Sequence, residues 1–316
     1  METLKYPNRL HVLTNTALGR MRSCERKYYL RNVVGLKARY RSERMDLGSA
    51  FHAGIEHQDP KAASAYLRKT ALVQMPEGFA DEKLEERCIV AEAMVTAALK
   101  KWDNWPERRE VPFRLPIFSP KGYPSRNYDM AGVIDGWPSD IPGNFWYDKC
   151  GEWKTTGRLN SDYILGLQTR SQPQGYCHSS SKILGRPIRT MVYRIAQKPT
   201  IGRRTKRNPE TLEQFAIRLA SYYDERPDLL YEEHVTFTDE QLEDWRIQMW
   251  EVSRRANDIR TERRFPIMND QSCVTFWRCE YLDLCARSVT EDAFDVLDDL
   301  HPELTAAMAA EGERNE

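Results

Sequence analysis

Two short stretches of the sequence constrain the fold most: Gly132-Val133-Ile134-Asp135 and Gly151-Glu152-Trp153-Lys154-Thr155-Thr156. Both are strand-like, and the interval between Asp135 and Glu152 leaves room for a loop that joins neighbouring antiparallel strands. Because side chains alternate along a strand, Glu152 and Lys154 project from one face while Trp153 points into the core. The sequence therefore predicts a place where two carboxylates and an ammonium group meet.

A pair of neighbouring carboxylates invites a hard divalent cation, because the two negative charges otherwise repel each other. Such a cation polarises a phosphate oxygen and lowers the pKa of a bound water. Lys154 would then hold or activate that water, or neutralise charge that develops on the phosphate. Asp135, Glu152 and Lys154 are therefore the candidate catalytic residues.

The composition is that of a folded protein, with 316 residues, 41% hydrophobic and 30% charged, which suits one large domain or two small ones. The N-terminus lacks the basic start and apolar stretch of a signal peptide, and no apolar run reaches membrane-spanning length, so we expect a cytoplasmic location and no membrane partner. Lysine and arginine (47) balance aspartate and glutamate (47), so any attraction to nucleic acid must be local. Seven cysteines in a reducing compartment favour metal or cluster ligation over disulfides.

Periodicity divides the chain into a helical beginning, a strand-rich middle and a mixed remainder. The expected helices cover 14 to about 30, 46–57, 60–74, 81–104, 159–184, 210–224 and 239–260. The expected strands cover 111–115, 128–137, 145–155, 187–196 and 232–238, the first three forming an antiparallel meander. Pro173 breaks or kinks the helix over 159–184.

Asp135 with Glu152-Trp153-Lys154 resembles the core of the PD-(D/E)XK nuclease superfamily, in its RecB-like exonuclease branch, which includes phage-type and CRISPR-associated nucleases with an iron–sulfur staple. An acid followed two residues later by a lysine occurs by chance in most chains, so the resemblance depends on further elements in family order. Gly48-Ser49-Ala50-Phe51-His52 matches the small-residue pattern before a metal-binding helical histidine. Gln172-Pro173-Gln174-Gly175-Tyr176 matches the QxxxY motif that follows the strand with the acid and lysine.

The resemblance implies a metal site and DNA contacts. His52, Asp135 and Glu152 would hold Mg²⁺ or Mn²⁺, with the backbone carbonyl of Trp153 as a further ligand. Gln172 and Tyr176 would place DNA beside the metal. In the proline-bounded loop over 198–209, four basic residues are candidate contacts to the phosphate backbone: Arg203, Arg204, Lys206 and Arg207.

Two acids remain as weaker candidates near this site. Glu56 lies one helical turn after His52 and is an outside candidate for a metal ligand. Glu110 precedes the first expected strand. It could support the metal ligands from behind, but we expect a surface acid.

Cys273, Cys279 and Cys285 recur at equal spacing near the end of the chain. They could be core residues, yet closely spaced thiolates are also what an iron–sulfur cluster needs. The family resemblance adds Cys24, because many RecB-like nucleases join one N-terminal cysteine to three C-terminal ones around a [4Fe-4S] cluster. The gap between Cys273 and Cys279 is wider than in the family, so Zn²⁺ is the alternative.

The resemblance implies an α/β fold with a restriction-endonuclease-like central mixed sheet flanked by helices, and a C-terminal cysteine-bearing segment closing on an N-terminal helical region. We expect a single domain over 1–300, with a flexible tail over 301–316. Its parts would be a helical part (14–105), a catalytic core (106–260) and a cysteine-rich closure (261–300).

The implied activity is metal-dependent hydrolysis of DNA. Exonuclease action on single-stranded ends is the commonest activity in the family, and a helicase or recombination protein is the implied partner. Two other hypotheses stay open. One is a DNA-binding recombination or repair accessory protein with this fold and little catalysis, and the other is a structural metalloprotein in which only the cysteines bind metal.

Overall fold

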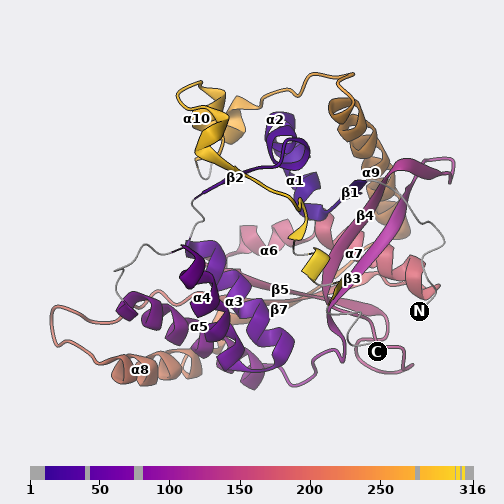
Figure 1. Ribbon diagram of the computed structural model, residues 1–316. Helices are drawn as coiled ribbons and strands as arrows, with labels where there is room; N and C mark the ends of the chain where they lie inside the picture. Colours follow the sequence, from indigo (N-terminus) through magenta and orange to yellow (C-terminus); the bar gives the residue numbers. More distant parts are fainter. Residues whose placement is uncertain are drawn as a thin grey trace.

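The fold is built on a central mixed sheet with the strand order β1-β4-β5-β6-β7, in which β3 also pairs with β4 (Figure 1). The computed structural model describes residues 11–39, 43–74, 81–274, 278–302, 304–306 and 308–309. The strands of this sheet are β1 (His11–Leu13), β3 (Arg109–Phe118), β4 (Pro124–Gly136), β5 (Lys149–Thr156), β6 (Thr190–Gln197) and β7 (Leu230–Thr236). The β3-β4-β5 run is antiparallel, as predicted, whereas β5 and β6 are parallel.

Helices cover both faces of the sheet. On one face α1 (Asn15–Ser23), α7 (Ser171–Leu184) and α9 (Asp239–Arg260) enclose one hydrophobic core. On the other face, α3 (Glu43–His57), α4 (Pro60–Gln74), α5 (Asp81–Lys101) and α8 (Leu212–Asp224) enclose a second core. The predicted α/β fold with a central mixed sheet flanked by helices is thus confirmed.

Further short elements complete the chain. They are α2 (Glu25–Tyr28), a π-helical turn (Tyr29–Val33), α6 (Ser161–Leu167), α10 (Leu282–Cys285), and the 3-10 turns Pro227–Leu229, Asp270–Cys273 and Glu291–Ala293. Within the described ranges, no helix combines the length and the apolar character needed to cross a membrane. The tail expected over 301–316 lies partly outside the described residues.

The break between α6 and α7 is not where the sequence placed it. Pro173 was expected to interrupt a helix, but α7 begins at Ser171, so Pro173 lies in its first turn. The first turn of a helix has no intrahelical partner for its N–H groups, so proline is tolerated there. The segment over 159–184 forms two helices because α6 ends at Leu167, before Pro173.

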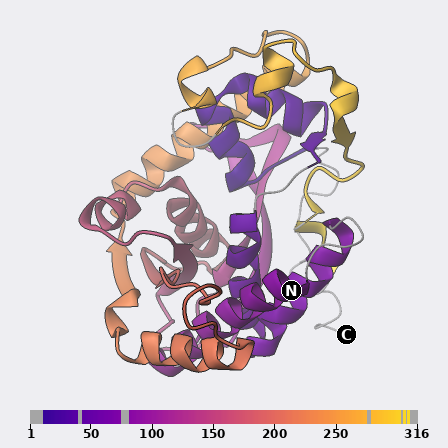
Figure 2. The ribbon, with the colours of Figure 1, turned by 90° about the vertical axis from the view of Figure 1, so that its left-hand side faces the viewer.

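The two ends of the chain meet in a separate small sheet. Strand β2 (Leu36–Ala38) pairs antiparallel with β8 (Phe294–Val296), and Tyr281 is buried against this sheet, where its hydroxyl donates to the Leu36 carbonyl at 2.7 Å. Figure 2 shows the yellow C-terminal segment lying over the indigo N-terminal helices. The C-terminal segment therefore closes on the N-terminal region, as the sequence predicted.

Candidate active site

The candidate site lies where β4 and β5 approach each other. The strands pair at Gly136 and Gly151, and a Cβ added to Gly136 would lie 2.9 Å from the Gly151 Cα. A Cβ on Gly151 would clash with the ring of Trp153. Because only glycine permits this approach, Asp135 comes beside β5, where its Oδ2 accepts the Trp153 N–H at 2.7 Å.

Glu152 and Lys154 project from the same face of β5, as alternation predicted. Lys154 Nζ forms an ion pair with Glu152 Oε1. On the opposite face, Trp153 is fully buried with edge-on contacts to Trp105 and Trp146. Trp153 anchors one face of β5 in the second core, so Glu152 and Lys154 project from the opposite face.

His52 reaches the site from α3. Gly48 allows α3 to lie close to β5, since a Cβ there would be 3.3 Å from Thr155 Oγ1. One turn later, His52 Nδ1 lies 3.2 Å from Glu110 Oε1 and 3.6 Å from Asp135 Oδ2. Each of these residues offers a ligand atom, and the three atoms lie within 4.8 Å of one another, a spacing that could hold a metal ion.

Glu110 belongs to this cluster, so the expectation of a surface acid is wrong. Its side chain is only 20% exposed. Its backbone has φ 51°, a left-handed conformation that is rare for residues other than glycine and is often found at functional sites. Only part of the signal was available in the sequence: β3 was expected to pair with β4, but the register that joins Val111 to Ile134 and brings Glu110 level with Asp135 comes from the structure.

Glu152 is a buried acid that forms an ion pair with Lys154. Its side chain is 1% exposed, and Lys154 Nζ lies against Oε1, whereas Oε2 has no hydrogen-bond partner within the described part of the chain. Buried carboxylate oxygens are costly to leave unsatisfied, so this donor set fits a bound cation.

Burial and mutual repulsion disturb the titration of the acids. Burial, followed by the charge of Glu110, raises the pKa of Asp135 to about 6 although His52 opposes the rise. Burial and then the charge of Asp135 raise the pKa of Glu152 to about 7. Burial lowers the pKa of His52, but the neighbouring carboxylates of Asp135 and Glu110 outweigh it and bring the value to about 9. The site is thus rich in negative charge that a cation would neutralise.

Gln172 and Tyr176 extend the site along α7. Lys154 Nζ donates to Gln172 Oε1 at 3.4 Å, and Gln172 Nε2 donates to the Tyr176 hydroxyl at 2.8 Å. Tyr176 itself is buried, with 4% exposure. The QxxxY pair is therefore connected to Lys154 by side-chain hydrogen bonds.

Comparison with known proteins agrees with this arrangement. The family model of the PD-(D/E)XK nuclease superfamily matches residues 12–286. The chain belongs to this superfamily. A solved structure of a candidate exonuclease from Eubacterium rectale is 11% identical, with 95% of each chain covered and a TM-score of 0.52, which supports the fold.

Other comparisons add little. Two structures of Rai1 from Scheffersomyces stipitis are 10% identical over 77% of this nuclease-family chain, and cover 76% and 74% of their own chains. Their TM-scores of 0.22 and 0.19 are too low to bear on its fold. The curated proteins searched contain no match.

The basic loop of this PD-(D/E)XK protein is partly tied into the fold. Arg203 binds Glu82 and Glu86 at 2.7 Å each, and Arg204 lies 3.8 Å from Glu210. Two basic side chains of the loop are exposed and have no ion pair among the described residues: Lys206 and Arg207. In Figure 1 the loop before α8 projects to the left, beyond the helices.

Two other sequence candidates stand apart from the PD-(D/E)XK cluster. The Glu56 carbonyl accepts the Arg109 Nε–H at 3.0 Å, a contact that helps to fix the start of β3. The metal-ligand cluster among the described residues contains His52, Glu110 and Asp135, but neither Glu56 nor Glu152, so the role of Glu152 as a ligand stays a prediction. For Trp153, the backbone N–H bonds to Asp135, and the role of its carbonyl stays a prediction.

The cysteines at the two ends of the nuclease chain lie close together. Asn269 connects two of them: its N–H donates to Cys24 Sγ at 3.4 Å, and its carbonyl accepts from Cys273 Sγ at 3.6 Å. Burial and then the charges of Cys279 and Cys24 raise the pKa of Cys273. For Cys285, burial raises the pKa, Arg26 opposes it, and the other three thiols add to the rise.

Proposed function

We propose that this nuclease hydrolyses DNA phosphodiester bonds with the help of a divalent cation, and that it acts as an exonuclease on single-stranded ends. The observation that carries the proposal is the meeting of Asp135, Glu152 and Lys154 at one crossing of β4 and β5, with His52 and Glu110 beside them. Membership of the PD-(D/E)XK nuclease superfamily supports it.

The proposed metal ligands are His52, Glu110, Asp135 and Glu152, with the Trp153 carbonyl as a further one. Their oxygen-rich donor set suits Mg²⁺ or Mn²⁺. When bound, the cation supplies a Lewis acid for a phosphate oxygen and a water of lowered pKa. The unsatisfied Oε2 of Glu152 supports this assignment.

Lys154 is the proposed residue for water positioning and for neutralising charge on the phosphate. Glu152 holds it by an ion pair and Gln172 by a hydrogen bond. Burial lowers the pKa of Lys154, but the charges of Glu152 and Asp135 outweigh it and raise the pKa, so the ammonium keeps its proton and acts as a cation. Gln172, Lys206 and Arg207 are the proposed DNA contacts, and the buried Tyr176 is proposed to hold Gln172 in position for this contact.

The cysteines are proposed to hold a [4Fe-4S] cluster, with Zn²⁺ as the alternative. The four are Cys24, Cys273, Cys279 and Cys285, and all are free thiols. A tetrahedral zinc site with bonds of about 2.3 Å brings sulfurs to about 3.8 Å from one another. Among the residues that the structure describes, no three of these sulfurs lie within 4.8 Å of one another.

A nuclease assay on anaerobically purified protein tests the proposal. Single-stranded, duplex and circular single-stranded DNA are incubated with Mg²⁺, Mn²⁺ or EDTA. We expect metal-dependent degradation of linear single strands, resistance of the circle, and slow action on duplex unless a helicase is added. Loss of circular DNA would replace the exonuclease proposal by an endonuclease.

Matched variants test the site itself. Lys154→Ala and Asp135→Asn should each lower the rate by at least about 100-fold, the size expected for a group that stabilises transition-state charge. Lys69→Ala and Asp140→Asn are controls at exposed positions and should behave like the parent. If the site variants and the parent degrade DNA equally well, the assignment of this site is wrong, and an accessory role with little catalysis becomes the better account.

A further inference from the structure

A groove outside the candidate active site lies between the β3–β4 hairpin and the second half of α9. Its volume is about 530 Å³. The hairpin contributes Tyr123 and Arg126, and α9 with the residues after it contributes Trp250, Arg254 and Arg263. Figure 1 shows the hairpin of β3 and β4 extending beside α9.

The groove carries positive charge in a chain whose net charge is zero. Arg126 and Arg263 are exposed, and neither side chain has an acidic partner within the described ranges. Arg254 forms an ion pair with Glu251 at 3.6 Å on the surface of α9. Among the described residues that line the groove, Asp258 is the one acid against three arginines. Three guanidinium groups around one open space suit phosphate groups, which arginine binds in a bidentate manner.

Aromatic rings accompany these cations. Tyr123 is 70% exposed at the hairpin, so its ring is open to a ligand in the groove. Trp250 is half-buried in the opposite wall. Exposed rings interleaved with arginines are the features of surfaces that bind single-stranded nucleic acid, where bases stack on rings and cations follow the backbone.

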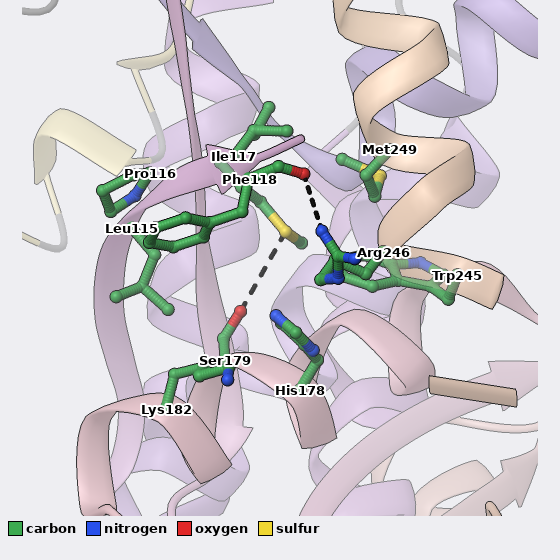
Figure 3. Close-up of a pocket in the computed structure, with 11 residues that line it drawn as sticks. Leu115, Pro116, Ile117, Phe118, His178, Ser179, Lys182, Trp245, Arg246 and Met249 are labelled. Atoms are coloured by element: carbon green, nitrogen blue, oxygen red, sulfur yellow. Dashed lines mark hydrogen bonds between the residues drawn. The ribbon is translucent and has the colours of Figure 1, made fainter. Parts of the chain in front are cut away.

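A neighbouring cavity lacks these properties. It is lined by residues that include His178, Lys182 and Arg246, and its volume is about 20 Å³ (Figure 3). This space holds little more than one water molecule. Arg246 is also occupied, because it binds Glu243 and the carbonyls of Phe118 and Ser119. The small cavity is therefore part of the packing between α7 and α9, not a ligand site.

The groove is far from the proposed cleavage centre. Arg126 and Asp135 both belong to β4, and nine residues of strand at about 3.3 Å each span about 30 Å. A short oligonucleotide bound at Asp135 cannot reach Arg126, whereas a longer strand can occupy both places.

We propose that this groove is a second binding site for the single-stranded DNA substrate, which grips the strand about 30 Å from the point of cleavage. The proposal rests on the proposed nuclease function for its choice of ligand. It predicts that affinity depends on strand length, because only long strands gain the contacts of Tyr123, Arg126, Arg254 and Arg263.

Fluorescence anisotropy in EDTA tests this without any cleavage. The probes are single-stranded DNA of about 4 and about 20 nucleotides, within and beyond the footprint of one small site. The measured quantity is the ratio of the two dissociation constants. In Arg126→Ala/Arg254→Ala the preference for the long strand should fall at least about tenfold, and the salt dependence of long-strand binding should weaken by about 1.4 in log–log slope, for two lost phosphate contacts.

A matched double variant removes two charges elsewhere. Arg255→Ala/Arg226→Ala changes the residue next to Arg254 on α9 and an exposed arginine after α8, neither of which lines the groove. It should keep the parental preference, and Tyr123→Ala should lose part of it. The groove proposal would be wrong if both double variants lost the preference for the long strand equally, or if the parent protein had no such preference. The parent protein could fail to cut DNA while only the groove variants lose the preference for long strands. That result would support the groove as a binding site and refute the nuclease proposal.

Discussion

At the scale of single residues, the candidate site is a set of acids held closer together than their charges favour. Asp135 is fixed by the Trp153 N–H, whereas Glu152 has only the ion pair with Lys154. Glu110 adds a further carboxylate at the cost of an unusual backbone conformation. A bound cation would relieve the repulsion among these acids and would satisfy the free oxygen of Glu152, which is why a cation is the natural occupant.

Glu110→Gln should weaken Mn²⁺ binding by about 10- to 100-fold, because groups that orient or add to metal ligands commonly have effects of this size. Titration calorimetry on the full-length protein measures the affinity. Glu107→Gln is the matched control, since Glu107 lies nearby but is exposed. The same affinity in Glu110→Gln and parent would show that Glu110 is outside the metal site.

Mn²⁺ should raise the melting temperature more at pH 8 than at pH 5.5. In the folded protein the pKa is about 6 for Asp135 and about 7 for Glu152. In the unfolded chain carboxyl groups have pKa values of about 4. Between these values the folded protein holds protons that the unfolded chain has lost. Without metal, the contribution of these two acids to stability is therefore complete below about pH 4 and falls as the pH rises from there through the folded values of about 6 and about 7. A cation competes with those protons, so its stabilisation grows over the same range.

Differential scanning fluorimetry with and without Mn²⁺ measures this effect. Asp140→Asn, which changes an exposed acid, should keep the pH dependence, and Glu152→Gln should reduce it. A metal-induced shift that is independent of pH would contradict the elevated pKa values.

At the scale of elements, the crossing of β4 and β5 decides where the acids lie. The two strands pair only at Gly136 and Gly151 in the described register, so a small change there moves Asp135 relative to Glu152. Behind this contact Trp153 leaves no space for a side chain at position 151. The site thus depends on backbone contact as much as on the acids themselves.

Gly151→Ala should destabilise the fold by about 1–3 kcal/mol, the usual cost of adding a methyl group to a filled core. Gly166→Ala is the control, because nothing lies within 4 Å of a Cβ there, and it should be neutral or slightly stabilising in α6. Urea unfolding gives both values. Equal stabilities of the two variants would mean that the strands can separate without cost.

At the scale of the whole molecule, the ends of the chain close on each other through β2, β8 and the cysteines. Anaerobically purified protein should be brown, and the colour should be lost in Cys279→Ala because one cluster ligand is missing. Cys88→Ala should remain brown, since Cys88 is buried in the second core. A colourless parent with stoichiometric zinc would assign the site to Zn²⁺ instead.

The sequence predicted much of this architecture because its signals were local. The alternation around Trp153 placed Glu152 and Lys154 on one face, and helical periodicity over 239–260 gave the bounds of α9. Glu110 was misjudged because its place depends on strand register, which one segment alone does not specify. Similarly, no property of Arg203 in isolation reveals that Glu82 and Glu86 hold it.

The closure of the two ends has a consequence for how the protein is made. Cys24 and Asn269, which contact each other, are 245 residues apart, so the first emerges from the ribosome long before its partner is translated. Any cofactor that the cysteines share can be inserted only after Cys285 has been translated.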